Sequence, residues 1–453
     1  MSLPNYFLAD LPPEAVLNPV LIGEACQALK RNRDQYLVGR STPQLVKAIS
    51  ETAENWLQPE YRFRQLALEA GPAASGFPRA TLARGLSAFF AQLTRENLQA
   101  LIVQDLGHAQ RLDSVIATGA EAGWQRAAMA CGPELLVHIT AGNIPSPAWL
   151  GIVLGLLVRS AQFVKCASGT SLLPRLFAHS LYEAEPKLAA CLEIAEWRGG
   201  DTTLEEPLFH EANCVTATGT EETLSSIRHR LPRRVRFLGY GHRVSFGYIA
   251  DEAWSGFGLE PLARRATDDI VAWNQLGCLS PHLFYVESDG PGQAEQFAER
   301  LAVELARREE VEPRGDLPLA EAALISSKRD FYRVRAAASA ETLIWCSEGS
   351  TAWTVVYEAD ARFQVSCLNR FIYVKGVSSL TEALQQADSV RGQVSTVGLA
   401  APEGQAREFA TQLARWGVRR VCALGRMQDP PLTWRHDGRP ALGDLVTWTD
   451  WEQ

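Results

Sequence analysis

The spacing of hydrophobic and polar residues changes near residue 130. Before it, apolar residues recur three and four positions apart, most clearly from 88 to 103, which predicts a mainly helical region. After it, short apolar runs alternate with glycine-containing loops. The runs 134–139 and 161–166 flank the longer apolar segment 148–158, and this order predicts a parallel strand, helix and strand unit.

The same alternation continues through the rest of the chain. Further strands are predicted at 190–195, 213–218, 234–238, 244–249, 283–286 and 418–424. Helices are predicted at 223–231, 294–311 and 405–416, the second with a mixture of basic and acidic residues that indicates a solvated surface. The polar and aromatic tail from Trp434 to Trp448 is either a flap or a packed terminus, and we favour the packed terminus.

Composition and charge narrow the class of protein. With 46% hydrophobic and 21% charged residues among 453, the chain has the composition of an ordinary globular protein. A net charge of -8 argues against a nucleic-acid surface. One basic cluster stands out, and it could bind an anionic ligand or be a solvated strand or helix end: Arg228, Arg230, Arg233, Arg234 and Arg236.

Targeting signals and cysteine spacing suggest a compartment. The first residues lack the basic region and apolar core of a signal peptide, and the longest apolar run is too short to span a bilayer. Nine cysteines without a CxxC pair are typical of free thiols. We therefore expect a cytoplasmic protein.

Cys278 is the candidate nucleophile. It stands in a turn-like sequence, between Gly277, which leaves room for a substrate, and Pro281, which fixes the chain as a strand begins. The alternative is a small buried hydrophobic residue. His282 belongs to the predicted strand, whose side chains alternate, so we expect the thiol to be activated by backbone N–H groups rather than by a Cys–His pair.

Two loops have the composition of ligand-binding loops. Asn143 precedes Pro145 and Pro147, which suit the first turn of a helix, so Asn143 should face the ligand crevice of an open sheet. Gly219 and Thr220 precede another helix, whose free N–H groups could hold a pyrophosphate. The string GYGHRV contains only two glycines of the dinucleotide fingerprint and is a weak signal. Phosphate-loop, HExxH and GxSxG signatures are absent from the sequence, and the eight histidines lack ligand spacing, so we expect no metal site.

Four segments in order resemble the motif set of the aldehyde dehydrogenase superfamily: 140–147, 164–170, 218–221 and 274–278. Within that superfamily, GCLSPH around Cys278, LNRFIYV at 368–374 and HDG at 436–438 most closely resemble LuxC-type fatty-acyl-CoA reductases. The resemblance covers roughly residues 130 to 453. It implies an α/β, aldehyde dehydrogenase-like fold with a Rossmann-like cofactor domain plus an α/β catalytic domain. The expected divisions are 1–130, a helical region packing on the cofactor domain; 131–247, the dinucleotide-binding domain; 248–425, the catalytic domain; and 426–453, a tail.

The resemblance also implies roles for single residues. Cys278 would be the nucleophile, and the Asn143 amide would stabilise the oxyanion together with the Cys278 N–H, unless Asn143 only caps the following helix. Lys165 would reach the cofactor ribose, or be an ordinary lysine with a buried stem. Gly219 and Thr220 would contact the nicotinamide-side phosphates. Ser168 stands where an acidic residue often selects NAD, so its short neutral side chain favours NADPH.

Two departures from the superfamily pattern favour a reductase. The segment 237–242 has no carboxylate where oxidising members carry a water-activating glutamate, and Ser366 to Leu368 replaces the usual Glu-x-Phe. His242 is the nearest titratable group and would be an acid or base, or a structural histidine.

The predicted activity is NADPH-dependent reduction of an acyl-CoA thioester, for which we expect a fatty acyl group, to an aldehyde through an acyl-cysteine. The alternatives are an NAD(P)-dependent aldehyde dehydrogenase that makes acid, and a non-redox acyl-transfer component. The expected partners are acyl-CoA or another acyl thioester, an acyl carrier protein or an acyl-protein synthetase, and further copies of the chain in a homo-oligomer.

Overall fold

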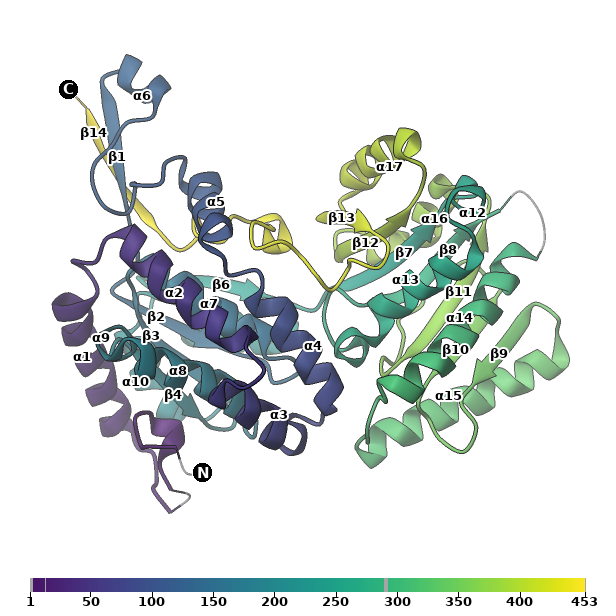
Figure 1. The fold of residues 1–453 in the computed structure, drawn as a ribbon, viewed down its shortest axis with the longest axis horizontal. Helices are drawn as coiled ribbons and strands as arrows, with labels where there is room; N and C mark the ends of the chain where they lie inside the picture. Colours follow the sequence, from purple (N-terminus) through teal and green to yellow (C-terminus); the bar gives the residue numbers. More distant parts are fainter. Residues whose placement is uncertain (1–2, 13, 289–291, 453) are drawn as a thin grey trace. The chain divides into compact units, whose positions relative to one another are not determined.

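The computed structural model describes residues 3–12, 14–288 and 292–452. They divide into two compact units (Figure 1). Unit 1 consists of Met1–Ser75, Leu86–Gly241 and Pro431–Gln453, and unit 2 consists of Gly76–Gly85 and His242–Pro430. The functional boundaries expected near 130, 247 and 425 remain a proposal.

Unit 1 is built on a five-stranded parallel sheet in the order β4-β3-β2-β5-β6. Its strands are β2 (Leu135–Ile139), β3 (Ala161–Cys166), β4 (Leu192–Glu196), β5 (Cys214–Thr218) and β6 (Arg236–Tyr240). The two central strands β2 and β3 are buried along their whole length, as is typical of parallel strands covered on both faces. The strands predicted from the apolar runs of this region are confirmed.

Helices cover both faces of this sheet. Those of unit 1 are α1 (Pro19–Tyr36), α2 (Thr42–Leu57), α3 (Arg62–Ser75), α5 (Arg95–Leu106), α6 (Gly119–Gly123), α7 (Ser146–Leu157), α8 (Leu172–Ala184), α9 (Pro186–Ala189), α10 (Thr202–Glu211) and α11 (Glu221–Arg230), with short 3₁₀ turns η1 (Leu8–Asp10) and η4 (His436–Gly438). Helix α4 (Arg79–Phe90) runs from unit 2 into unit 1. The mainly helical region predicted before residue 130 is confirmed. Its periodic stretch 88–103 is divided between α4 and α5, because Thr94 accepts a hydrogen bond from the Asn97 N–H and begins the separate helix α5.

A two-stranded antiparallel ribbon completes unit 1. It joins β1 (Arg126–Cys131) to β14 (Thr447–Glu452), which is exposed along its whole length. Arg126 forms ion pairs with Asp450 and Glu452 across the ribbon. Within the tail of residues 434–448 that was predicted to be a packed terminus, Leu442, Leu445 and Val446 are buried, whereas residues 447 and 448 pair with a distant strand instead of packing into a core.

Unit 2 contains a seven-stranded sheet in the order β13-β12-β7-β8-β11-β10-β9, parallel except for the edge strand β9. Its strands are β7 (Val244–Ile249), β8 (Pro281–Glu287), β9 (Thr342–Cys346), β10 (Thr354–Glu358), β11 (Phe371–Val377), β12 (Val394–Ala400) and β13 (Arg420–Ala423). Its helical elements are α12 (Glu252–Phe257), α13 (Leu259–Val271), η2 (Ala272–Gln275), α14 (Gln293–Val311), α15 (Leu319–Ala338), α16 (Leu380–Gln386), η3 (Asp388–Val390) and α17 (Glu403–Trp416).

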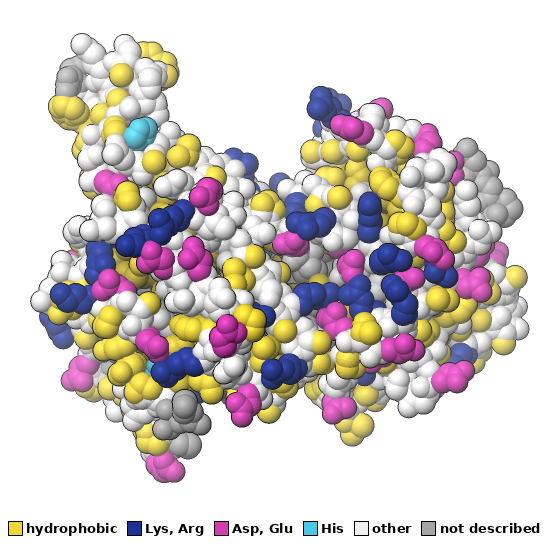
Figure 2. Space-filling model, in the orientation of Figure 1, with side chains coloured by type: hydrophobic (Ala, Val, Ile, Leu, Met, Phe, Trp, Pro, Cys, Tyr) yellow, Lys and Arg dark blue, Asp and Glu magenta, His cyan; other side chains and the backbone are white. Residues whose placement is uncertain are grey.

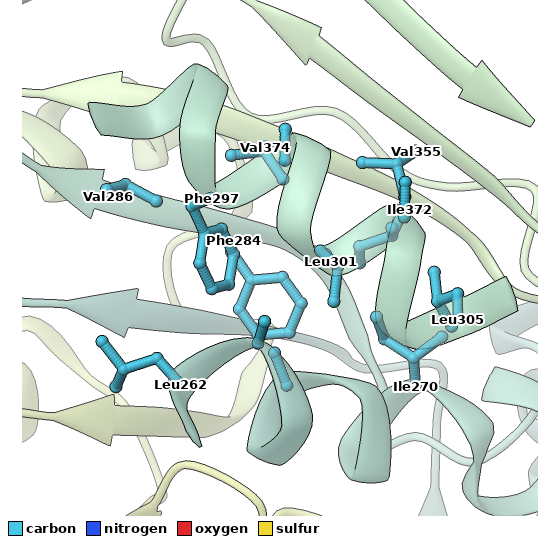
Figure 3. Close-up of a cluster of buried hydrophobic side chains, with 14 of the residues drawn as sticks. Leu262, Ile270, Phe284, Val286, Phe297, Leu301, Leu305, Val355, Ile372 and Val374 are labelled. Carbon is cyan, nitrogen blue, oxygen red and sulfur yellow. The ribbon is translucent and has the colours of Figure 1, made fainter. Parts of the chain in front are cut away.

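The central strand β8 divides the core of unit 2 between its two faces. Phe284 and Val286 pack with α13 and α14 (Figure 3), whereas Leu283 and Tyr285 belong to the cluster on the other face. The expectation that 294–311 is a solvated surface helix is wrong. Helix α14 buries Phe297, Leu301 and Leu305 along one face, because its apolar residues recur at helical spacing between the charged ones.

On the face that Figure 2 shows, basic and acidic side chains are interspersed, so this face has no large patch of a single charge. The basic cluster of residues 228–236 is largely engaged within the protein. Arg230 pairs with Glu205, Arg234 donates to the Ala212 carbonyl, and Arg236 donates to the carbonyls of residues 444–446. In the described part of the chain, no helix combines the length and the apolar character needed to cross a bilayer.

Candidate active site

The sheet of unit 1 has a topological switch point between β2 and β5. The chain winds from β2 through β3 to β4 in one direction, and from β5 to β6 in the other. Ligands of open α/β sheets bind at such a point, beyond the carboxyl ends of the strands. The loop after β2 carries Asn143, which is exposed two residues before the N-cap of α7, and the loop after β5 carries Gly219 and Thr220. The Ala141 N–H donates to Thr218 Oγ1 at 3.1 Å and links the two loops.

Lys165 lies at the carboxyl end of β3. Its side chain is buried beside the Trp197 ring, with Nζ 5.7 Å from the ring centroid, and burial lowers the pKa of the ammonium group. Among the described residues, no carboxylate forms an ion pair with it. Its Nζ is 3.8 Å from the position that a Cβ on Gly199 would occupy. A buried ammonium group without an ion-pair partner fits a hydroxyl or anionic group of a ligand.

Ser168 is exposed on the next loop, and a carboxylate that the sequence analysis missed lies at the base of that loop. Glu196, the last residue of β4, accepts hydrogen bonds from the N–H groups of Gly169 at 2.5 Å and Ser171 at 3.0 Å. Gly169 has a φ of +79°, which favours glycine. Each Glu196 oxygen therefore holds the loop, and we interpret this residue as the support of Ser168.

The start of α11 is less suited to an anion than predicted. Thr220 caps the helix by accepting from the Thr223 N–H at 3.3 Å, but Glu221 and Glu222 occupy the first turn. A hydrogen bond with Thr220 lowers the pKa of Glu222, which keeps it ionised. Two carboxylates offset the favourable potential of the helix N-terminus. A pyrophosphate would have to contact the loop before the helix rather than its first turn.

The segment 237–242 has no carboxylate of its own, yet one reaches it from α11. A Cβ on Gly241 would overlap the carboxylate of Glu221. Sequence reasoning missed this approach because the two residues are on different elements. The HDG segment lies against the same region: His436 stacks on Tyr240 at 4.7 Å, and Arg439 donates to the Gly239 carbonyl at 3.0 Å.

Cys278 lies in unit 2, at the amino end of β8. The Ser280 N–H donates to the Gly277 carbonyl at 2.9 Å, so Cys278 is at the corner of a tight turn. Its carbonyl accepts from Ser245 Oγ at 2.9 Å, and its side chain is half-buried. A Cβ on Gly277 would lie 3.0 Å from Gln428 Oε1, which gives this glycine a packing reason beyond access for a substrate.

Two runs of three successive residues, each with left-handed backbone conformation, hold the turn that carries Cys278. Trp273, Asn274 and Gln275 have φ values of 52°, 50° and 67°, and residues 368–370 have values of 64°, 55° and 64°. Such conformations cost about 1 kcal/mol or more per non-glycine residue and persist only where the surroundings fix them. Here each run bonds to the other: Arg370 Nε donates to Asn274 Oδ1 at 3.1 Å, and Gln275 Nε2 donates to the Phe371 carbonyl at 3.0 Å.

Arg370 is fully buried, and it was not identified from the sequence. Its Nη1 donates to Glu309 Oε2 at 2.8 Å and to the Glu312 carbonyl at 2.9 Å. Burial lowers the pKa of Arg370 to about 10, which leaves it charged near neutral pH. The LNR part of the LNRFIYV string thus contributes a buried cation that supports the turn that carries Cys278, and the motif was the available signal.

The two histidines near this turn differ in environment. His282 is buried, and its Nδ1 accepts from the Ser366 N–H at 3.1 Å. Burial, and next the charge of His242, lower the pKa of His282 to about 4. It is therefore neutral near pH 7 and unsuited to an ion pair with a thiolate. His242 is exposed at the start of unit 2.

The segment after β13 is anchored by a buried carboxylate. Asp269 accepts from the N–H groups of Gly425 at 2.7 Å and Met427 at 2.8 Å. Burial raises the pKa of Asp269 to about 7, with Asp268 adding to the effect and Arg420 opposing it.

This shift predicts a pH dependence of stability. Because the folded state binds the proton more tightly than the unfolded chain, the folded state loses relative stability as the pH rises from about 4 to about 7. We expect the free energy of unfolding of Asp269→Asn, relative to wild type, to rise by an amount on the order of a few kcal/mol across that window and then level off. Urea titrations at a series of pH values measure it, and a difference independent of pH would contradict the assignment.

The predicted site residues fall into the two units as follows. Unit 1 contains Asn143, Lys165, Ser168, Gly219 and Thr220, all on loops or strand ends at the carboxyl edge of its sheet. Unit 2 contains Cys278 and His242.

Solved structures share this fold. The chain superposes on proline utilization A of Bradyrhizobium japonicum with a TM-score of 0.72 at 16% identity, over 96% of this chain and 45% of that one. For the NAD-dependent benzaldehyde dehydrogenase of Corynebacterium glutamicum the TM-score is 0.69 at 12% identity, over 96% and 91%. The fold is therefore the α/β, aldehyde dehydrogenase-like fold, with its Rossmann-like sheet in unit 1.

The chain belongs to the acyl-CoA reductase (LuxC) family, whose sequence profile matches residues 38–448. It is 23% identical to the long-chain acyl-protein thioester reductase of Aliivibrio fischeri over 421 residues, which are 90% of this chain and 82% of that protein. The corresponding protein of Vibrio harveyi is also 23% identical, over 320 residues that make up 70% of this chain and 64% of that protein. The match thus spans less than two thirds of the Vibrio harveyi protein.

Proposed function

We propose that this protein reduces a long-chain acyl thioester to an aldehyde through an acyl group on Cys278, with NADPH as the reductant. The observation that carries the proposal is the position of Cys278 in a member of the LuxC family: a half-buried thiol at the corner of a turn whose backbone is fixed on both sides. The named relatives are acyl-protein thioester reductases, which supports an acyl thioester as the substrate class.

In the proposed reaction the Cys278 thiolate attacks the thioester carbonyl carbon, and the donor's sulfur leaves with a proton. The Cys278 N–H and the Asn143 amide stabilise the oxyanion that forms. Bound NADPH would supply the hydride. With that hydride on the acyl carbon, the bond from this carbon to Sγ would break, which would release the aldehyde and return Cys278 as a thiolate. An acyl group carried by coenzyme A, by a carrier protein or by an acyl-protein synthetase would react with Cys278 in the same way.

The residues of unit 1 fit a nicotinamide dinucleotide in part. Lys165 offers a buried ammonium group to a ribose hydroxyl, and the loops with Gly219 and Thr220 lie at the switch point, whereas the carboxylates of α11 disfavour its first turn for phosphate. Ser168 would leave space for a 2′-phosphate, and the exposed Arg198 after β4 adds a cation to that side of the sheet.

Ser168→Glu tests the preference for NADPH. A carboxylate at this position would repel a 2′-phosphate and accept from a 2′-hydroxyl. We expect the Kd of NADPH to rise at least about tenfold and that of NADH to stay the same or fall, as measured by nicotinamide fluorescence. Ser168→Gln, of the same size without charge, is the control. Equal effects on both dinucleotides would contradict the placement of Ser168.

One observation favours a second function, the oxidation of an aldehyde to an acid. The Glu221 carboxylate beside Gly241 could activate water where the segment itself has no glutamate. Product analysis separates the two functions. Acyl-CoA with NADPH should yield aldehyde, and aldehyde with NADP should yield an acyl thioester when a thiol acceptor is present, and little free acid. Rapid formation of free acid would favour the second function and contradict the first.

The proposal also includes a cellular compartment and an oligomeric state. All nine cysteines are free in the structure, which suits a reducing cytoplasm. We also propose a homo-oligomer, and size-exclusion chromatography with light scattering measures its mass.

The acyl-cysteine intermediate can be detected directly. Intact mass after incubation with acyl-CoA and no NADPH should show one acyl group, located by peptide mapping on Cys278.

A further inference from the structure

The side chain of Gln428 bridges the two ends of the turn that carries Cys278. Its Oε1 lies 3.0 Å from the position of a Cβ on Gly277, and its Nε2 donates to Ser280 Oγ at 2.5 Å. The turn itself is closed by the hydrogen bond from the Ser280 N–H to the Gly277 carbonyl. Gln428 therefore contacts the residue before Cys278 and the residue two positions after it.

The backbone that bears Gln428 is held in place. The Asp269 carboxylate accepts from the N–H groups of Gly425 and Met427, and Arg420 donates to the Met427 carbonyl at 2.7 Å. The Met427 side chain is fully buried. A side chain that extends from such a fixed segment can hold a turn in one conformation, because its own backbone does not move with the turn.

The contact between Gln428 and Gly277 lies beside the peptide whose N–H is part of the proposed reaction. The peptide between Gly277 and Cys278 carries the N–H that would stabilise the oxyanion, and Gln428 packs against its Gly277 side. The next peptide is anchored at the Cys278 carbonyl by Ser245 Oγ, which in turn accepts from the Thr396 N–H at 3.1 Å. We infer that Gln428 is a positioning residue that aims the Cys278 N–H at the oxyanion of the acylation step, an inference that rests on the proposed function.

Two reactions of the same sulfur separate this role from a general structural one. Acylation by hexadecanoyl-CoA passes through an oxyanion, whereas alkylation by iodoacetamide is a displacement at carbon and forms none. Gln428→Met keeps the volume beside Gly277 but removes the hydrogen bond to Ser280. We expect it to lower the rate constant of Cys278 acylation about 10- to 100-fold while alkylation stays within about twofold of wild type. Peptide mapping restricts both measurements to Cys278.

A double-mutant cycle tests whether Gln428 acts through its hydrogen bond to Ser280. Ser280→Ala removes the other half of the hydrogen bond, so Gln428→Met combined with Ser280→Ala should be acylated about as slowly as the slower single variant. The inference is overturned if the two effects multiply, if acylation is unchanged in Gln428→Met, or if both reactions slow equally. A wild-type protein that is alkylated but never acylated would refute the proposed function itself, whereas a wild-type protein that is acylated together with any of these three results in the variants refutes only the role of Gln428.

Discussion

Cys278→Ala is expected to lower the rate of aldehyde formation from an acyl thioester and NADPH by at least about 10³-fold, because no other group would accept the acyl chain. The acyl adduct seen by intact mass should disappear with it. NADPH binding should be unchanged, since the proposed cofactor residues are all in unit 1. The measurement is aldehyde by gas chromatography, together with nicotinamide fluorescence.

Cys346→Ala is the matched control for this variant. Cys346 is a free, half-buried cysteine of the same unit, on the edge strand β9. It should retain activity and the acyl adduct. Aldehyde formation by Cys278→Ala at a rate near wild type would show that the thiol is not the nucleophile, and the proposed function would have to be abandoned.

Phe284→Ala is expected to destabilise unit 2 by about 3 to 5 kcal/mol, the cost of removing a buried aromatic ring and leaving a cavity. Phe284 is fully buried on the central strand β8 and packs at 5.9 Å from the Phe297 ring (Figure 3). It also fills the space above Gly247, where a Cβ would overlap its ring.

Val303→Ala on α14 is the control for this substitution. Val303 is 48% exposed, so its truncation should change the free energy of unfolding by less than about 0.5 kcal/mol. Urea unfolding followed by tryptophan fluorescence measures both variants. A loss of less than about 1 kcal/mol for Phe284→Ala would mean that this core relaxes around the cavity or that β8 is not its centre.

The local pattern of the sequence predicted the parts of the fold that local physics determines. Runs such as 161–166 and 244–249 form strands because parallel strands covered on both faces need continuous apolar segments. The same local reasoning failed for β14, whose partner β1 is far away in the chain, and for α14, whose charged residues concealed an apolar face.

The residues of the candidate site likewise divide into those that the sequence could predict and those that it could not. Cys278, Asn143 and Lys165 could be proposed from motifs, since glycine and proline mark the loops around them. Arg370, Gln428, Glu196 and Glu221 could not, because each acts on an element distant in sequence through a side chain whose direction only the folded chain defines. Positive φ at Trp273 and Leu368 was equally hidden, because neither residue type favours that conformation.

The ribbon of β1 and β14 also has a consequence for synthesis of the protein. A ribosome releases β1 together with the strands of the first sheet, but β14 emerges only after the intervening residues 132–446 have been made. Until then the backbone N–H and C=O groups of Arg126–Cys131 lack the strand that pairs with them in the finished protein. An unpaired strand of a nascent chain can join a strand of a neighbouring chain on the same messenger, so this segment is a place where the chains of a polysome are prone to mispair.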